Sequence, residues 1–227
     1  MVEINEETWY NKGVFKMELI YMKYDISFVK TVLSNKINIL SLEYIGSGNH
    51  CDAFCINNNL VIKMPKNEKA SKCLLTEINI LQYLNEKITI NIPNVMQLGT
   101  FVYNDKTFNY FISRKVEGKT LTKIEFNSLT DDELEINAQI VANFLKQLHK
   151  EKSIFNIKRK DFVPLHGDFS LNHILFDDKN KVCGILDFAD ARVGKYTSDF
   201  VYLLDDEDQE EFGMKFGLLV LEKYKNL

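Results

Sequence analysis

The sequence predicts an α+β protein with two lobes, the first a mainly antiparallel sheet with one main helix and the second mainly helical. Three observations support this organisation. Apolar clusters separated by turn signals run from about residue 41 to residue 116. One segment with helical spacing interrupts them at 69–87, and the longest helical pattern follows at 129–150. We therefore expect one lobe over residues 1–115 and a second over residues 116–227.

The first lobe is built from five expected strands. Segment 41–65, SLEYIGSGNHCDAFCINNNLVIKMP, predicts three antiparallel strands with tight turns at GSGN and NNN. Segment 95–116 predicts a hairpin that turns at Asn104 and Asp105. The helix at 69–87 is expected to pack on this sheet through residues that recur at helical spacing: Cys73, Leu74, Ile78, Leu81 and Leu84.

The second lobe begins after a short linker, GKT. Thr130 and Glu133 form a capping-box pattern at the start of the helix at 129–150, which has one apolar face. Short extended pieces are expected around HGDFSLNHILF and KVCGILDF, joined by the turn DDKNK. From residue 197 to the end the pattern is helical again.

Composition excludes several classes of protein. With 227 residues, 45% of them hydrophobic, the chain can form a sizeable core. Its apolar stretches are shorter than the roughly 18 residues of a membrane span, and its N-terminus lacks a signal-peptide pattern. The four cysteines are too scattered for a disulfide framework and are expected to be buried thiols. A net charge of −4 argues against a nucleic-acid surface. We expect a cytoplasmic monomer without membrane or nucleic-acid partners.

The stretch HGDFSLNH, residues 166–173, carries the first chemical signal. Asp168 lies between the apolar runs FVPL and ILF, which can hold an aspartate rigidly enough to accept a proton from a hydroxyl group. Asp187 ends the expected strand CGILD, where a carboxylate is suited to a hard cation such as Mg²⁺. A base paired with a metal-binding acid is what phosphoryl transfer requires.

The pattern H-x-D followed by D-F-x resembles the catalytic and metal loops of the protein-kinase-like fold. HGDFSLNH together with ILDFAD is similar to the aminoglycoside phosphotransferases, and SLNH with SDFVYLLDD is similar to their 2″-phosphotransferase group. The resemblance covers about residues 38–225. It implies a two-lobed kinase-like fold and Mg²⁺-dependent transfer of the γ-phosphate of ATP or GTP to a hydroxyl group of an aminoglycoside.

The same resemblance assigns residues to the nucleotide. Gly46, Ser47 and Gly48 lie on a turn between strands, where missing side chains let backbone amides approach phosphate oxygens. Lys63 on the third strand and Glu77 on the next helix follow the order of the kinase lysine and its glutamate. In FISRKV, residues 111–116, the backbone around Ser113 and Lys115 is expected to read the purine.

One position departs from the kinase pattern. Kinases have an asparagine five residues after the catalytic aspartate, whereas this chain has His173 there and Asn172 one residue earlier. The resemblance implies that His173 is the second metal ligand beside Asp187. Mg²⁺ prefers oxygen, so the amide of Asn172 remains a rival.

Other motif residues are expected to support the site. The resemblance implies that His166 braces the loop that contains Asp168 and that Asp199 anchors it; simple helix capping is the alternative for Asp199. His149 is interpreted as a helix C-terminal cation or a core histidine rather than a ligand. His50 receives no role.

A second substrate is indicated by acidic residues. Asp190 follows the expected metal loop, and Asp208 lies in an acid-rich run at 205–211; both are expected to bind the ammonium groups of a cationic aminosugar. For most of that run, a solvated helix start is an equal interpretation. Two alternatives stay open: a kinase of another small hydroxyl compound, such as choline, an amino alcohol or a sugar, and a nucleotide-binding pseudoenzyme fragment. Because the resembling family continues with further helices, we expect the chain to be truncated at its C-terminus, with weakened acceptor binding.

Overall fold

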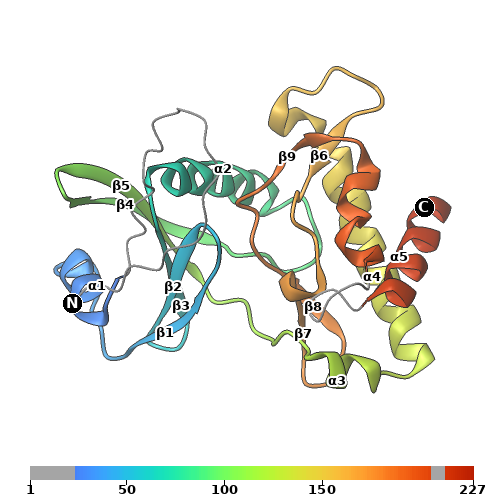
Figure 1. Cartoon of the computed structure of the whole chain (residues 1–227), viewed down its shortest axis with the longest axis horizontal. Helices are drawn as coiled ribbons and strands as arrows, with labels where there is room; N and C mark the ends of the chain where they lie inside the picture. Colours follow the sequence, from blue (N-terminus) through green and yellow to red (C-terminus); the bar gives the residue numbers. More distant parts are fainter. Residues whose placement is uncertain (1–23, 206–212) are drawn as a thin grey trace, which may run out of the picture.

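The protein, for which we use a computed structural model that describes residues 24–205 and 213–227, has an α+β fold with an N-terminal antiparallel sheet (Figure 1). The sheet has five strands in the order β1-β2-β3-β5-β4. All five strands were predicted and are confirmed: β1 (Leu42–Ser47), β2 (Cys51–Ile56), β3 (Leu60–Pro65), β4 (Val95–Tyr103) and β5 (Lys106–Arg114).

The turns of this sheet follow from asparagine and aspartate. Asn104 and Asp105 join β4 to β5 with φ angles of 48° and 58°, and Asn57 and Asn58 join β2 to β3 with φ angles of 52° and 62°. These values lie in the left-handed region, which Asn and Asp tolerate better than most residues. The β4–β5 loop has two residues, which suits a type I′ turn, whereas the β2–β3 loop has three, Asn57 to Asn59. The predicted turn at Asn104 and Asp105 is confirmed.

Two helices cover opposite faces of the sheet. Helix α2 (Glu68–Leu84), predicted at 69–87, begins at Asn67, whose side chain accepts the N–H of Ala70 at 2.8 Å. Alternate residues of β5 point to the two faces, as the strand period demands. Phe111 joins the core that contains the buried face of α2, whereas its neighbours Tyr110 and Ile112 join a second core with α1 (Ile26–Leu33). Helix α1 was not predicted.

The second half of the described chain is dominated by helix α4 (Asp131–Lys150), where the predicted capping box of Thr130 and Glu133 is present. A short helix, α3 (Lys123–Asn127), precedes it with a capping box of its own and was not predicted. Helix α5 (Met214–Asn226) packs against α4 (Figure 1). In this half the core lies between these helices and the short strands described next.

Two pairs of short strands lie between the sheet and the helices (Figure 1). Strands β7 (Ile174–Phe176) and β8 (Val182–Ile185) form the predicted hairpin. Strands β6 (Val163–Leu165) and β9 (Arg192–Gly194) pair across a longer stretch of chain. The pairs place the two predicted acidic loops, the HGD loop (residues 166–173) and the DFAD loop (residues 187–190), at the ends of strands.

The helical prediction from residue 197 onward is wrong for its first part. Segments Tyr196–Phe200 and Tyr202–Leu204 are 3₁₀ turns, and among the residues described after position 196 only those of α5 form an α-helix. Further 3₁₀ turns occupy Lys152–Phe155 and Leu171–His173. The carboxylate of Asp199 points back to the HGD loop, as shown below, so this side chain does not cap a helix.

Three general expectations can be compared with the described residues. All four cysteines are free; Cys51 and Cys55 are buried, whereas Cys73 and Cys183 are only half-buried. Among the described helices, none has the length and apolar character that crossing a membrane would need. The lobe boundary after residue 115 stays a prediction.

Candidate functional site

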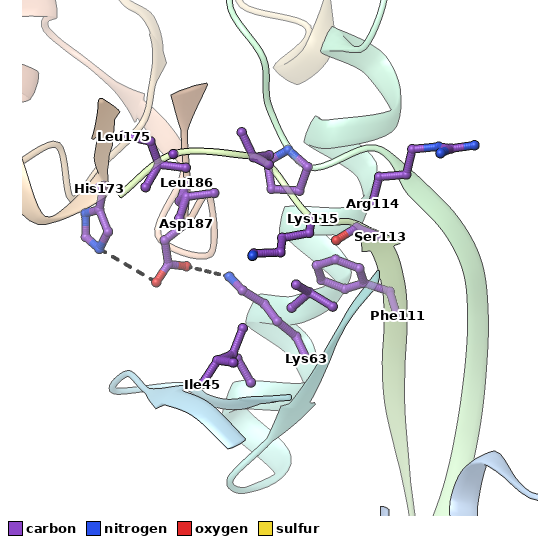
Figure 2. A pocket seen from close by; sticks show the side chains of 15 residues that line it. Ile45, Lys63, Phe111, Ser113, Arg114, Lys115, His173, Leu175, Leu186 and Asp187 are labelled. Atoms are coloured by element: carbon purple, nitrogen blue, oxygen red, sulfur yellow. Dashed lines mark hydrogen bonds and ion pairs between the residues drawn. The ribbon is translucent and has the colours of Figure 1, made fainter. Parts of the chain in front are cut away.

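Three charged residues from distant parts of the chain meet at one point, and Figure 2 shows two of them, Lys63 and Asp187, joined by a dashed line. Lys63 lies on β3, Glu77 on α2 and Asp187 two residues after the end of β8. The ammonium group of Lys63 donates to Glu77 Oε1 at 2.6 Å and to Asp187 Oδ1 at 3.0 Å. The expected pairing of the strand lysine with the helix glutamate is therefore present, and the structure adds Asp187 to it.

The charges of this cluster stabilise one another. Burial alone would lower the pKa of Lys63, but the carboxylates of Glu77 and Asp187 outweigh it and raise that pKa, so the amine stays protonated. Lys63 in turn lowers the pKa of Asp187 well below its usual range, against the effect of burial. Complete burial raises the pKa of Glu77, and Lys63 opposes this shift. The site thus holds a fixed ammonium group beside an ionised aspartate.

Two members of the cluster, Lys63 and Asp187, line a cavity of about 270 Å³, just below the range of small-molecule sites, about 300–1,000 Å³. Its polar end has Lys63, Asp187 and His173. The remaining wall is mostly apolar and includes residues from both halves of the described chain: Ile45, Ala53, Val61, Phe111, Leu175 and Leu186 (Figure 2). An apolar slot that ends in an ammonium and a carboxylate suits a ligand with a flat ring at one end and an anionic group at the other.

Ser113 and Lys115, which were expected to lie beside a purine, do line the cavity. The backbone of this segment is partly occupied, however. The N–H of Arg114 donates to the carbonyl of Asn94 at 3.0 Å, and that of Lys115 donates to the carbonyl of Asn59 at 2.9 Å. These two N–H groups are therefore not free to bind a base. The contacts expected between a purine and the backbone of residues 111–116 are limited to the other backbone groups of this segment.

The turn between β1 and β2, which we call the glycine turn (residues 46–50), lies over the charged cluster. A Cβ atom placed on Gly48 would be 3.8 Å from Asp187 Oδ2, so the backbone approaches this carboxylate closely. The turn is fixed from both sides: the hydroxyl of Ser47 donates to Asp52 Oδ1 at 2.7 Å, and Lys66 Nζ donates to the carbonyl of Gly48 at 2.6 Å. Sequence reasoning missed Asp52 and Lys66.

The HGD loop is held by a buried aspartate. The carboxylate of Asp199 accepts the backbone N–H groups of His166 and Gly167, both at 2.9 Å. Within the loop, Nδ1 of His173 donates to the backbone carbonyl of Asp168 at 2.7 Å. These bonds fix the backbone on both sides of Asp168, whose side chain is half-buried.

A histidine links this anchor to the C-terminal helix. Nε2 of His149 lies 3.0 Å from Asp199 Oδ2, and Nδ1 lies 2.9 Å from the hydroxyl of Tyr224. Burial would raise the pKa of Asp199, but its hydrogen bond from His149 and its other partners lower that pKa. Burial raises the pKa of Tyr224 to about 12, so its hydroxyl keeps its proton. His149 is thus a buried core histidine with both ring nitrogens occupied.

The HGD and DFAD loops are locked together. The ring of His166 donates from Nε2 to the carbonyl of Leu186 at 2.8 Å, and the N–H of Leu186 donates to the carbonyl of His173 at 2.9 Å. Gly167, at φ 92°, packs so closely that a Cβ atom would lie 2.0 Å from the carbonyl oxygen of Asp190. Arg192 closes the arrangement by donating to the carbonyl of Gly167 at 2.6 Å. Neither Arg192 nor this contact was foreseen.

Asp187 and His173 fit a cation between them. Because the Asp168 carbonyl can only accept, Nδ1 of His173 carries a hydrogen, and in the neutral ring Nε2 presents a lone pair. That nitrogen faces Asp187 Oδ2, another acceptor, at 3.8 Å. Two acceptors that face each other are suited to share a positive ion. The rival, Asn172, is exposed. Asp187 also has φ 61°, a left-handed conformation uncommon outside glycine.

Among the described residues, no cluster of three or more His, Cys, Asp and Glu side chains is arranged as a metal site. Mg²⁺ is commonly held by one or two carboxylates together with water and the phosphates of a substrate. The donor pair of His173 and Asp187 therefore fits an ion that binds together with a nucleotide.

Asp190, expected to bind the second substrate, has a partner that sequence reasoning did not anticipate. Nε2 of His50, on the glycine turn, lies 3.2 Å from Oδ1 and 3.1 Å from Oδ2 of Asp190. No local pattern could indicate this contact, because the residues are 140 positions apart. Asp208 lies outside the described residues.

Comparison with known proteins agrees with the fold and with the two loops described above. The model of the phosphotransferase enzyme family matches residues 152–225, which include the HGD and DFAD loops. The described chain has the kinase-like fold of the aminoglycoside phosphotransferases, so the fold expected from the resemblance is confirmed. Together these findings show a protein-kinase-like fold whose second half matches the model of the phosphotransferase enzyme family.

Solved structures show the likeness in more detail. The streptomycin–ATP ternary complex of APH(2″)-IIa is 23% identical, with a TM-score of 0.71, over 90% of this chain and 83% of that one. The GDP and kanamycin complex of APH(2″)-IIIa is 21% identical, with a TM-score of 0.74, over 88% and 83%. A macrolide 2′-phosphotransferase, MphH from Brachybacterium faecium, is 11% identical, with a TM-score of 0.62, over 88% and 82%.

Proposed function

We propose that this protein transfers the γ-phosphate of ATP or GTP to a hydroxyl group of an aminoglycoside. The observation that carries the proposal is the convergence of Lys63, Glu77 and Asp187 at one end of an apolar cavity. A phosphoryl-transfer site needs a fixed cation for the nucleotide phosphates and a carboxylate for their metal ion. Both groups are present beside a slot that can take a purine.

Within this proposal, side chains of the protein position the nucleotide and the acceptor hydroxyl group and supply positive charge to the phosphates. The ammonium of Lys63, oriented by Glu77, binds phosphate oxygens, and the glycine turn lies over them. The N–H of Gly48 already donates to the carbonyl of Cys51 at 3.0 Å, so this amide is not assigned to the phosphates. Asp168 accepts the proton of the acceptor hydroxyl group as that oxygen attacks the γ-phosphorus, and the bond from phosphorus to the β–γ bridging oxygen breaks. Asp199 and His166 keep the loop around Asp168 rigid.

The residues that would hold Mg²⁺ are Asp187 and His173, with Asn172 as the alternative to His173. Bound there with the nucleotide, the ion would supply charge neutralisation for the phosphates. Asp187 is kept ionised by Lys63, so it is ready to serve as a ligand.

The proposal of an aminoglycoside as the acceptor rests on an acidic residue next to the site and on the ligands of solved structures with the same fold. Solved structures with this fold contain streptomycin or kanamycin, according to their titles. Asp190 has a partly exposed carboxylate next to the DFAD loop, where it can bind an ammonium group of such an aminosugar. Asp208, in the acid-rich run, has the same proposed role.

The test is a nucleotide-consumption assay with Mg²⁺ and ATP or GTP across a panel of acceptors: aminoglycosides, a macrolide, choline and neutral sugars. We expect acceptor-dependent consumption with an aminoglycoside and a phosphorylated product by mass spectrometry. Asp168→Asn should reduce turnover by about 10²–10⁴-fold, the usual contribution of a general base. Its nucleotide affinity should stay within about twofold of wild type, because Asp168 is assigned to the acceptor.

Two results would contradict the proposal. If choline, a sugar or a macrolide is the preferred acceptor, the phosphotransferase class stands and the aminoglycoside assignment fails; the fold shared with a macrolide 2′-phosphotransferase makes the macrolide arm informative. If no acceptor stimulates nucleotide consumption while nucleotide still binds, the chain is a nucleotide-binding pseudoenzyme.

A further inference from the structure

His50 and Asp190 form a contact between two parts of the molecule that meet only in the fold. His50 ends the glycine turn, directly before β2, and Asp190 ends the DFAD loop. The imidazole Nε2 is almost equidistant from the two carboxylate oxygens, at 3.1 and 3.2 Å. One donor therefore engages the whole carboxylate.

The two side chains differ in exposure. The side chain of His50 is 22% exposed and that of Asp190 is 42% exposed, so solvent reaches the carboxylate beside the imidazole. A solvent-accessible carboxylate at the edge of a cleft attracts a cationic ligand. While the N–H of His50 faces the Asp190 carboxylate, an ammonium group of a ligand binds there less strongly, because the two donors repel each other.

The backbone is held by hydrogen bonds at both residues of the pair, in the glycine turn and in the DFAD loop. Lys66 donates two hydrogen bonds to the turn: its N–H donates to the His50 carbonyl at 2.8 Å, and its Nζ donates to the Gly48 carbonyl. On the other side, the carbonyl of Asp190 packs against Gly167 and accepts from Arg192 at 3.3 Å. Movement of the glycine turn therefore has to stretch or break the bond between His50 and Asp190.

We infer that His50 is a specificity-determining and positioning residue. It competes with an ammonium group of the acceptor for Asp190. When no acceptor ammonium group is bound, it holds the glycine turn over the nucleotide phosphates, a contact that we call the pin. The inference rests on the proposed function: the competition needs its cationic acceptor, whereas the pin needs only its nucleotide. An acceptor without a suitably placed ammonium group cannot displace His50, so the pair selects cationic acceptors. His50 touches no reacting atom.

The pin is tested without any acceptor by a double-mutant cycle on nucleotide affinity, with a fluorescent ATP analogue as the probe. His50→Ala and Asp190→Ala should each raise the nucleotide Kd by about two- to fivefold, the range of partly exposed charge pairs, and the double variant should be no worse than either single one. His50→Gln, which keeps an N–H donor, should restore most of the affinity. The matched control is the exposed pair of Lys106 and Glu68, 2.8 Å apart, neither of which lines the cavity.

The competition is tested with the acceptor. For an aminoglycoside, His50→Ala should lower the acceptor KM by about two- to fivefold, because no imidazole has to be displaced, whereas Asp190→Asn should raise it. A deaminated analogue of the same sugar should show neither change. Thermal unfolding of each variant verifies that it is folded.

The outcomes separate this inference from the proposed function. Additive effects of His50→Ala and Asp190→Ala on nucleotide Kd would refute the pin, even where aminoglycosides are phosphorylated. An acceptor KM that rises in His50→Ala would refute the competition. Absence of any aminoglycoside phosphorylation would refute the proposed function, and the nucleotide cycle would still decide whether the pin exists.

Discussion

The ammonium group of Lys63 lies 3.0 Å from the carboxylate of Asp187, a residue 124 positions later in the chain. This contact joins a strand of the N-terminal sheet to a loop of the second half. Because Lys63 also binds the buried Glu77, the three charges form one unit whose parts depend on each other. Substitutions in this unit should therefore change both the free energy of unfolding and kcat, and the two effects can be measured separately.

Lys63→Met should lower kcat by about 10²–10³-fold, because a pre-oriented charge beside the phosphates is lost. It also leaves Glu77 without its cation, so the free energy of unfolding should fall. A second substitution, Glu77→Gln, should recover part of that stability and none of the activity. Steady-state kinetics and urea unfolding measure the two effects. Lys106→Met, at an exposed position, is the control. Full activity in Lys63→Met would contradict the assignment.

His173→Ala should raise the Mg²⁺ concentration required for half-maximal turnover, by about 10-fold or more, because it removes the metal-ligand nitrogen that faces Asp187. Asn172→Ala should leave this concentration nearly unchanged, since Asn172 is exposed. A Mg²⁺ titration at saturating nucleotide gives both values. The opposite ranking of the two variants would make Asn172 the ligand.

Gly167→Ala should destabilise the protein by about 2–4 kcal/mol. The new methyl group meets the Asp190 carbonyl at 2.0 Å, and alanine is strained at φ 92°. Gly46→Ala is the matched control for stability, because no atom lies within 4 Å of its Cβ position, and its change should stay within about 0.5 kcal/mol. Urea unfolding at neutral pH measures both. Equal stability of the two variants would show that the two loops are not tightly packed.

Asp199→Asn should destabilise the protein by roughly 1.5–3 kcal/mol at neutral pH, because a charged acceptor of two backbone amides is lost. The folded-state pKa of Asp199 lies below the ordinary value of 3.8. Its contribution is therefore complete above that value and is lost as the pH falls through the lower folded-state pKa.

The gap in unfolding free energy between wild type and Asp199→Asn should accordingly be constant between about pH 5 and 7 and narrow below about pH 4. Urea unfolding at several pH values measures this. A gap that narrows already near pH 6 would assign the effect to a histidine. A gap that persists below pH 3 would mean that the charge of Asp199 is not involved.

The elements that the sequence predicted correctly are those with strong local signals. The type of turn at Asn104 and Asp105 follows from residues that accept a left-handed backbone, and the start of α4 follows from the capping box of Thr130 and Glu133. The 3₁₀ turns at 196–204 were mistaken for a helix, because apolar spacing over so few residues does not separate the two forms. Helix α1 is short and was missed.

For the site, sequence reasoning found residues that carry a motif and missed residues that act through long-range contacts. The order of Lys63 and Glu77 predicted their pairing, which is present. The contact of His50 with Asp190 and the clamp of Arg192 on Gly167 have no local signature, because each joins segments whose proximity only the fold decides. The chemical roles of all these residues stay predictions until the experiments above are done.

The hairpin of β7 and β8 is bonded to two chain segments next to the sheet, one before β4 and one after β5. Asn91 accepts the N–H of Ile185 at 3.0 Å, and Lys119 exchanges two backbone bonds with Phe176 at 2.8 and 3.0 Å. Lys119 is the neighbour of Gly118, which lines the cavity, so these bonds hold the hairpin close to the cavity wall. Rotation of the sheet relative to the hairpin would have to break them, which should keep the width of the cavity constant at this wall.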